Sequence, residues 1–132
     1  NSLLFLMKDR SPNVRDWATF GIGSQIDVDN EIIREALYKN CFDKDDNTKN
    51  EAIAGLVERK DKRAFEIIKN ELNKKNIGSL LFDSIQNIDN NVLFLPKLKQ
   101  IFDESKKDEE INKVWLKSLA DCIHFIELEE ND

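Results

Sequence analysis

Cysteine, proline, glycine and histidine are all scarce in this sequence. It holds two Cys, two Pro, four Gly and one His in 132 residues. So few turn-forming residues argue against a β fold, which needs many tight turns. The two cysteines, Cys41 and Cys122, lie too far apart to form the disulfide framework of a small secreted domain. We therefore expect reduced thiols and a cytoplasmic protein.

Long apolar runs and concentrated positive charge are also missing. No stretch approaches the roughly 18 apolar residues of a membrane-spanning helix, and apolar residues 2–7 follow no basic region, so no signal peptide is indicated. The 26 acidic residues outnumber the 20 basic ones, for a net charge of −6. We expect neither nucleic acid nor a membrane as partner, because both bind to basic surfaces. The chain begins with Asn inside a predicted helix, so we also expect residues upstream of Asn1.

A sequence echo at an offset of 34 residues is the most informative feature present. The segment that begins at Asp9 and ends at Gly21 returns in degraded form from Asp43 to Gly55. An aspartate, an asparagine, a basic residue, an alanine and a glycine hold the same relative positions in both copies. A period near this length is typical of stacked helical repeats, in which no single repeat can bury its own apolar face.

Apolar residues recur at helical spacing along almost the whole chain, and polar breakers separate the helical segments. Ser11-Pro12 is one such breaker, and it predicts an N-cap followed by proline at the first helical position. The pattern predicts an all-α protein with eight helices in four pairs: 2–8 with 12–25, 29–41 with 46–60, 62–74 with 76–89, and 92–104 with 109–124. We interpret the chain as one domain, 1–132, of four repeats at roughly 1–27, 28–61, 62–90 and 91–124. The acidic tail 125–132 is expected to fray.

The pairing of an aspartate with a basic residue six positions later resembles the HEAT-repeat family. The matching residues are Asp9 with Val14, Arg15 and Ala18, then Asp43 with Lys49 and Ala52, and Pro96 in a later first helix. In particular, it resembles the bacterial short HEAT-like repeats that also occur in phycobilisome-lyase-type proteins. The third repeat lacks the pair, and the fourth has Lys107 in place of the aspartate. The resemblance implies a right-handed α-α superhelix with first helices on the convex side and second helices on the concave side.

The aspartate–basic pairs also have a physical interpretation that is independent of any family. A carboxylate at a turn can accept hydrogen bonds from free N–H groups at a helix start and from the guanidinium of the neighbouring repeat. We therefore expect Asp9, Arg15, Asp43 and Lys49 to lie between the first two repeats and to act structurally. Gly21 and Gly55 are expected to permit close helix approach, and the basic cluster 60–63 to be a solvated turn.

The sequence patterns that could indicate a metal or catalytic site all lack residues that such a site needs. Asp43 begins a segment like a calcium-binding loop, but Thr48 and Ala54 stand where such a loop needs glycine and glutamate. His124 and Cys122 have no second pair to complete a zinc site, and a single histidine cannot serve a Ser-His-Asp or Cys-His arrangement. The glycines near Ser24 are not followed by the lysine of a phosphate-binding loop. We predict no catalytic residue, no metal and no cofactor.

One face of the second helices is predicted to be the binding surface. With Ala18 at the centre of the core stripe, Phe20 projects almost opposite, and Trp17 lies on a flank expected to pack against a neighbouring repeat. For Phe20, packing against a segment outside this chain and contact with a partner remain equally open. The face that contains Phe20 carries three aspartates and no lysine or arginine. The predicted partner-binding residues are Asp16, Phe20, Asn50, Asp83, Gln86 and Asp121.

Two classes of function remain. The first is a non-enzymatic scaffold whose acidic concave groove binds a peptide or helix of a protein partner, with a preference for a basic one. The alternative is a lyase-associated or DNA-glycosylase-like enzyme, because HEAT-like repeats also build such enzymes. A glycosylase needs a basic surface with aromatic side chains around an extruded base, whereas this groove is predicted to be acidic. The charge therefore favours the interaction module.

Overall fold

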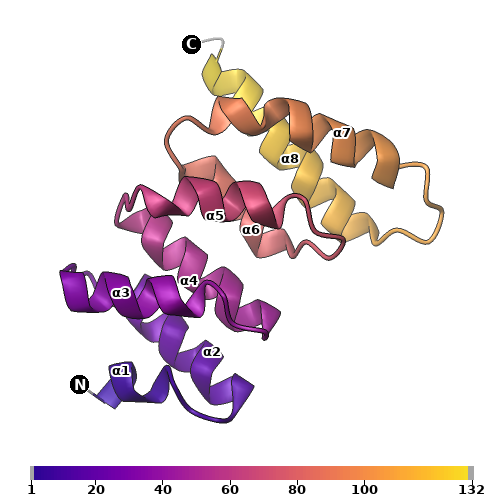
Figure 1. Ribbon diagram of the computed structural model, residues 1–132. Coiled ribbons are helices and arrows are strands. Elements are labelled where there is room, and N and C mark those ends of the chain that lie inside the picture. Colours follow the sequence, from indigo (N-terminus) through magenta and orange to yellow (C-terminus); the bar gives the residue numbers. More distant parts are fainter. Residues whose placement is uncertain (1, 131–132) are drawn as a thin grey trace. The chain divides into compact units, whose positions relative to one another are not determined.

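The computed structural model describes residues 2–130, and this part of the chain is all-helical (Figure 1). The all-α prediction is confirmed. The first six helices fall within the predicted ranges, whereas the seventh ends at Ser105 instead of 104 and the eighth at Glu130 instead of 124. Their bounds are α1 Ser2–Leu6, α2 Pro12–Phe20, α3 Glu31–Asn40, α4 Asp46–Glu58, α5 Arg63–Glu71, α6 Ser79–Asn87, α7 Leu95–Ser105 and α8 Lys113–Glu130. A π-helix, Gly21–Gln25, continues α2, and a 3₁₀ helix, Asn91–Phe94, precedes α7. Among the described residues, no helix is long and apolar enough to cross a membrane.

The chain divides into two compact units, Asn1–Ile67 and Ile68–Asp132. We call them the first and the second compact unit. The boundary falls inside α5, so residues 63–67 of this helix belong to the first unit and residues 68–71 to the second. Each compact unit has its own apolar core.

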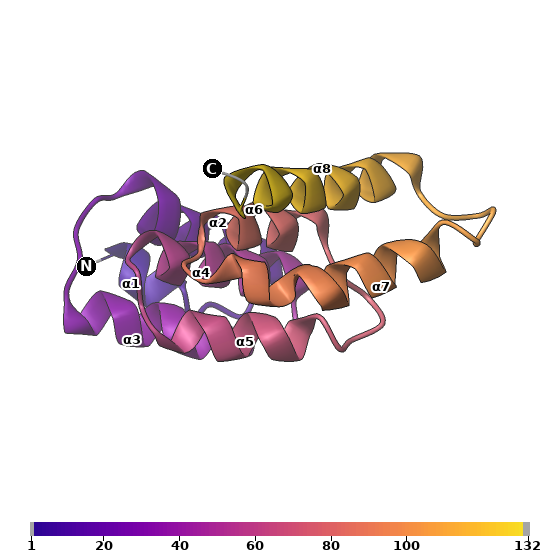
Figure 2. The same cartoon turned by 90° about the horizontal axis from the view of Figure 1, so that it is seen from above.

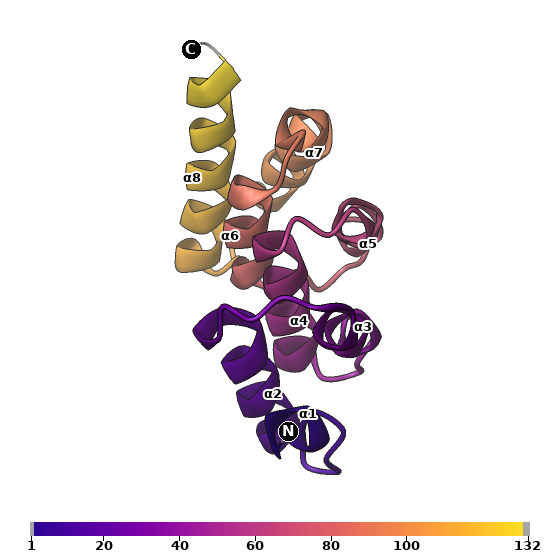
Figure 3. The ribbon, with the colours of Figure 1, turned by 90° about the vertical axis from the view of Figure 1, so that its left-hand side faces the viewer.

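Two layers of helices form the first compact unit. In Figure 3, α1 and α3 are seen nearly along their axes, with α2 and α4 beside them. α4 packs against α2, α3 and the π-helix. The core between these helices is formed by fully buried apolar side chains, among them Ala18, Ile22, Leu37, Ile53 and Leu56. These residues follow the helical spacing of the sequence, which is why the apolar pattern predicted the helices well.

Polar side chains cap the N-termini of three of these helices, and the sequence predicts the first of these caps, at Ser11. The Ser11 hydroxyl accepts from the Val14 N–H, and Pro12 follows at the first helical position. Asn30 Oδ1 accepts from the Ile33 N–H at 2.9 Å, and Asp45 Oδ2 accepts from the Thr48 N–H at 3.0 Å. Each cap satisfies an N–H group that has no partner within its own helix.

Gly23 and Gly55 bring the π-helix into close contact with α4. A Cβ atom added to Gly55 would lie 2.9 Å from the Gly23 Cα atom and 3.0 Å from a Leu37 methyl group. The prediction named Gly21 and Gly55, and it was wrong about Gly21, where an added Cβ would make only an ordinary contact with Leu3 at 3.5 Å. The π-helix explains the error, because its wider turn shifts residues 21–25 away from the positions expected for an α-helix.

The second compact unit is built around α8, which packs against α6 and α7. Figure 2 shows the loop that joins α7 to α8 and lets the two helices run side by side. The predicted fraying after Phe125 is wrong, because α8 continues to Glu130. Ile126 is buried one turn after Cys122, and Lys99 of α7 pairs with Glu127 at 2.9 Å. These contacts stabilise the acidic last turns; residues 131 and 132 lie outside the described part of the chain.

Candidate functional site

Arg15 and Asp43 join the first two predicted repeats. The guanidinium of Arg15 donates from Nε and Nη2 to both carboxylate oxygens of Asp43, at 2.8 and 3.0 Å, and from Nη1 to the Asp9 carbonyl at 3.0 Å. Asp43 also accepts from the Asp45 N–H at 2.8 Å, and Asp9 accepts from the Ser11 N–H. This bidentate geometry confirms the predicted structural role of Arg15 and Asp43.

The surroundings of Asp43 favour its ionised form. Burial alone acts to raise its pKa, but the hydrogen bonds from Arg15 and from the Asp45 N–H, together with the charge of Arg15, outweigh burial and lower the pKa below its ordinary value. Lys49, the basic residue of the second pair, lies 3.2 Å from Asp46 and is buried. Arg15 and Lys49 therefore both form ion pairs within the protein and are not available at an open surface.

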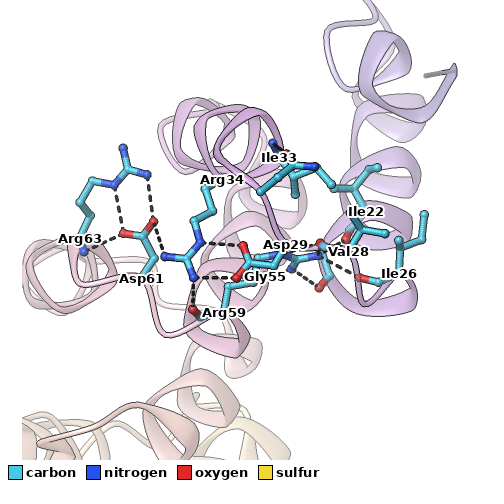
Figure 4. Close-up of polar contacts among 12 residues, drawn as sticks. Ile22, Ile26, Val28, Asp29, Ile33, Arg34, Gly55, Arg59, Asp61 and Arg63 are labelled. Atoms are coloured by element: carbon cyan, nitrogen blue, oxygen red, sulfur yellow. Dashed lines mark hydrogen bonds and ion pairs between the residues drawn. The ribbon is translucent and has the colours of Figure 1, made fainter.

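Arg59, which the sequence analysis did not single out, anchors the end of the π-helix. Its buried guanidinium donates to five backbone carbonyls at 2.8 to 3.3 Å (Figure 4). The carbonyls belong to Ile22, Gly23, Ile26, Val28 and Gly55. These bonds satisfy carbonyl groups that a helix leaves without partners at its C-terminal end. Because a backbone carbonyl is present at every residue, no side-chain pattern in the sequence could have revealed these partners.

A chain of ion pairs continues from Arg59 across the turn to α5. Arg34 pairs with Asp29 at 2.7 Å and donates to the Arg59 carbonyl at 2.6 Å. Arg63 binds the buried carboxylate of Asp61 at 2.9 and 3.0 Å (Figure 4). These hydrogen bonds hold the pKa of Asp61 below its ordinary value. The solvated turn predicted for residues 60–63 is therefore wrong for Asp61, which is a buried element of the structure.

The six predicted binding residues are divided between the two compact units. Asp16 and Phe20 lie on α2 and Asn50 on α4 of the first unit; Asp83 and Gln86 lie on α6 and Asp121 on α8 of the second. Asn50 is only 7% exposed, because the packing of α4 covers it, so it offers a partner almost no surface. Asp83 and Asp121 are exposed, but Asp121 is paired with Lys117 at 2.9 Å, so that part of the face is not purely acidic.

Asp16 has a neighbour that the sequence analysis missed. Glu51 of α4 lies close enough for the charge of Asp16 to act on it, and its backbone carbonyl is close to Gly23 of the π-helix. Burial raises the pKa of Glu51, and the charge of Asp16 raises it further. Burial likewise raises the pKa of Asp16, as does the charge of Asp45. Within residues 2–130, neither Asp16 nor Glu51 forms an ion pair or a hydrogen bond through its side chain.

Exposed aromatic residues accompany this acidic pair on α2. Phe20 lies one helical turn after Asp16 and is 40% exposed, as its predicted position opposite the core stripe requires. Trp17 is 64% exposed, so the prediction that it packs against a neighbouring repeat is wrong for this part of the chain. We call Asp16, Trp17, Phe20 and Glu51 the α2–α4 surface. It combines negative charge with aromatic side chains in a single small region.

The chemical groups that could suggest catalysis do not come together. Among the described residues, no three His, Cys, Asp or Glu side chains form a group that could hold a metal ion. Burial, with a contribution from the charge of Asp83, raises the pKa of the Cys122 thiol to about 12. A thiol of that pKa is almost entirely protonated at neutral pH and is a poor nucleophile.

Comparisons with known proteins find similarity to protein YibA of Escherichia coli. No model of a known protein family matches the sequence. Protein YibA of Escherichia coli K-12 and its counterpart in E. coli O157:H7 are each 39% identical to this chain over 75 residues, which is 57% of this chain and 26% of theirs. An X-ray structure of E. coli YibA is similar to 92% of this chain, with a TM-score of 0.65 and 29% identity, and the match covers 42% of that structure. The chain thus matches only about a quarter of the length of its curated relatives, and it shares its helical fold with part of YibA.

Proposed function

We propose that this chain is a non-enzymatic protein-interaction module that binds a basic peptide or helix at the α2–α4 surface of its first compact unit. The observation that carries the proposal is the pair Asp16 and Glu51, which have no cation partner among residues 2–130. Exposed Phe20 lies one helical turn after Asp16 on α2. A lysine or arginine of a partner would supply the missing positive charge.

The energetics of the acidic pair support a role in binding. Burial is the main cause of the raised pKa of both carboxyls, with added repulsion from Asp45 on Asp16 and from Asp16 on Glu51. Ionising such groups without a compensating cation destabilises the folded protein at neutral pH. Features that lower stability without an internal benefit are expected at functional sites. A partner's ammonium or guanidinium group would turn this repulsion into attraction and speed association at low salt.

The aromatic side chains would supply the apolar part of the interface. Aromatic residues are enriched at the positions that contribute most to binding, and a polar rim around them excludes water. Phe20 and Trp17 are exposed on α2, and Asp16 and Glu51 supply the charged rim. This arrangement suits the helix-in-groove or peptide-binding modes that helical repeats commonly use.

The proposal extends to the type of repeat, to further contact residues and to the cellular location. We infer HEAT-like repeats in a right-handed α-α superhelix, supported by the 34-residue echo and by the Arg15–Asp43 link between successive helix pairs. Asp83, Gln86 and Asp121 are proposed as further contacts within the second compact unit. A cytoplasmic location is proposed from the two buried cysteine thiols, Cys41 and Cys122, which form no disulfide.

The test compares affinity with stability in variants of the α2–α4 surface. The probes are a labelled arginine-rich amphipathic peptide and its glutamate-rich counterpart, measured by fluorescence anisotropy at low and high salt. We expect preference for the arginine-rich peptide, which Asp16→Asn with Glu51→Gln should abolish. Phe20→Ala should weaken binding by about 1 kcal/mol or more while the melting temperature stays nearly unchanged.

The matched control is Glu66→Gln, which removes an exposed carboxylate of α5 in the same compact unit. It should leave the affinity for both peptides unaltered. Equal binding of both peptides would argue against the acidic surface. If Phe20→Ala instead destabilises the fold by about 3–5 kcal/mol, as expected for a buried phenylalanine, then Phe20 is a core residue and the proposal fails. A pull-down from the source organism would then search for the natural partner.

A further inference from the structure

An open apolar groove runs along α1 and α3 of the first compact unit, and it is separate from the α2–α4 surface. The groove has a volume of about 480 Å³, and its lining comes from α1, α3 and Lys8. Leu4, Phe5, Ile32 and Ala36 form the apolar part of the lining. Figure 1 shows α1 and α3 next to each other.

Two large side chains leave this groove unusually apolar for a protein surface. Phe5 is 75% exposed and Ile32 is 70% exposed. Single exposed apolar residues are ordinary, but a group of them along one groove marks an interaction site. Ile32 and Ala36 lie four residues apart on one face of α3, so the apolar strip follows the helix axis.

The positive charges around the groove lie at one end of it. The Asn40 amide donates to the Met7 carbonyl at 3.1 Å, which places the end of α1 beside the end of α3. Lys8 and Lys39, the chain neighbours of Met7 and Asn40, therefore line the same end of the groove. Within residues 2–130, neither of these lysines forms an ion pair or a side-chain hydrogen bond.

The opposite end of the groove carries weaker negative charge. Glu31 begins α3 and lies two turns before Lys39. Glu35, between them, is already neutralised by Arg63, whose Nη1 lies 2.6 Å from a Glu35 carboxylate oxygen. The groove is thus positive at one end, apolar in the middle and mildly negative at the other. Such a pattern is complementary to a ligand that carries negative charge at one end of an apolar body.

The length of the groove fits a short helix. The stretch of α3 that lines it, Glu31 to Lys39, covers about 12 Å at 1.5 Å per residue. A partner helix of two to three turns would place apolar side chains at i, i+4 and i+7 along this distance. The shallow form of the groove favours a peptide over a free amphiphile, since pockets for small molecules enclose most of their ligand and Phe5 and Ile32 are mostly exposed.

We propose that the α1–α3 groove is a second docking site, which binds an amphipathic helical segment of a partner protein with its acidic end at Lys8 and Lys39. The apolar face of the segment would cover Phe5 and Ile32, and its carboxylates would pair with the two free lysines. The ligand chemistry is opposite to that of the α2–α4 surface, so the two sites would select different segments.

Two labelled synthetic peptides test this docking site. Both carry leucines at i, i+4 and i+7; one ends in glutamates and the other in lysines. Fluorescence anisotropy should show tighter binding of the glutamate peptide. Phe5→Ser with Ile32→Ser should weaken that binding about tenfold or more. Lys8→Glu with Lys39→Glu should weaken it about fivefold at low salt and less at high salt, while improving binding of the lysine peptide.

Matched controls separate this site from general effects. Val28→Ser and Lys62→Glu change an exposed apolar and an exposed basic residue of the same compact unit outside the groove. They should leave both affinities unchanged, as should Phe20→Ala. If the double serine variant loses helix content by circular dichroism, Ile32→Ser alone carries the test. Equal binding of the two peptides would overturn the proposal, and so would lysine-dependent binding of dodecanoate without binding of either peptide, which would assign the groove to a free amphiphile.

Discussion

The two compact units are stabilised by different kinds of contact. In the first, buried polar groups join successive segments, as in the Arg15–Asp43 pair and the Arg59 bonds to five carbonyls. In the second, the main links are apolar and aromatic: the rings of Phe82 and Trp115 meet edge to face with centroids 5.4 Å apart. Three ion pairs of the second unit join exposed side chains, where such pairs contribute little. A fourth, between Lys74 and the buried Glu71, links residues only three apart in the chain.

This difference follows the fading of the sequence repeat. The aspartate–basic signature is present in the first two predicted repeats and absent or altered in the last two. Where it fades, Trp115 supplies a substitute, because its indole N–H donates to the Ile77 carbonyl at 2.6 Å while its ring packs on Phe82. An aromatic side chain with one polar atom can therefore join two segments where the charged pair is lost.

The largest expected losses of stability come from removing a buried polar link in the first compact unit and an aromatic link in the second. Arg59→Ala should lower the stability of the first compact unit by about 3–5 kcal/mol, because it leaves buried carbonyls without donors. Phe82→Ala should lower that of the second by a similar amount, about 3–5 kcal/mol, through the loss of a fully buried ring. Segment-resolved hydrogen exchange should show faster opening of α2 and α4 in the arginine variant and of α6 and α8 in the phenylalanine variant.

Arg59→Lys sharpens this comparison. Lysine retains the charge but cannot reach five carbonyls with a rigid planar group. We expect it to recover only a small part of the lost stability. Faster exchange throughout residues 2–130 in both alanine variants would contradict the distinction between the two units, since it would mean that they unfold together.

A smaller effect is expected at the glycine contact of the first compact unit. Gly55→Ala should lower the free energy of unfolding by about 1–3 kcal/mol, because the added Cβ would overlap Gly23 and Leu37. Gly21→Ala is the matched control: its Cβ would only touch Leu3, and alanine favours a helix over glycine by up to about 1 kcal/mol. Urea unfolding should therefore show a lower free energy of unfolding than the wild type for Gly55→Ala and a higher one for Gly21→Ala. A Gly55→Ala variant as stable as the wild type would show that α4 can move away from the π-helix.

Sequence reasoning worked where the signal is local. Helix positions and the N-cap at Ser11 depend on neighbouring residues, and they were predicted closely. Arg59 escaped prediction because its partners are backbone groups up to 37 residues away. Phe20 was placed correctly at the surface by helical geometry alone, whereas Asn50 and Trp17 were not, because their exposure depends on what packs against each helix. Glu51 was missed for the same reason: only the packing of α4 against α2 places it beside Asp16.

The smallest expected effect is a pH dependence of the first compact unit with two opposing parts. Asp16 and Glu51 have raised pKa values, so their ionisation costs stability above those values, and the cost disappears as the pH falls toward about 4. Asp43 and Asp61 have lowered pKa values, so they add stability above the ordinary value of about 4, and this stability is lost as the pH falls further through their folded pKa.

Thermal melts of the first compact unit should thus show a shallow rise in stability on mild acidification, followed by a loss. Asp16→Asn with Glu51→Gln should remove the rise and be slightly more stable than the wild type at pH near 7, whereas Asp43→Asn should be less stable there and lose less in strong acid. If Asp16→Asn with Glu51→Gln is less stable than the wild type at neutral pH, the two carboxylates form favourable contacts within the protein. The proposal that they bind a cation of a partner must then be abandoned.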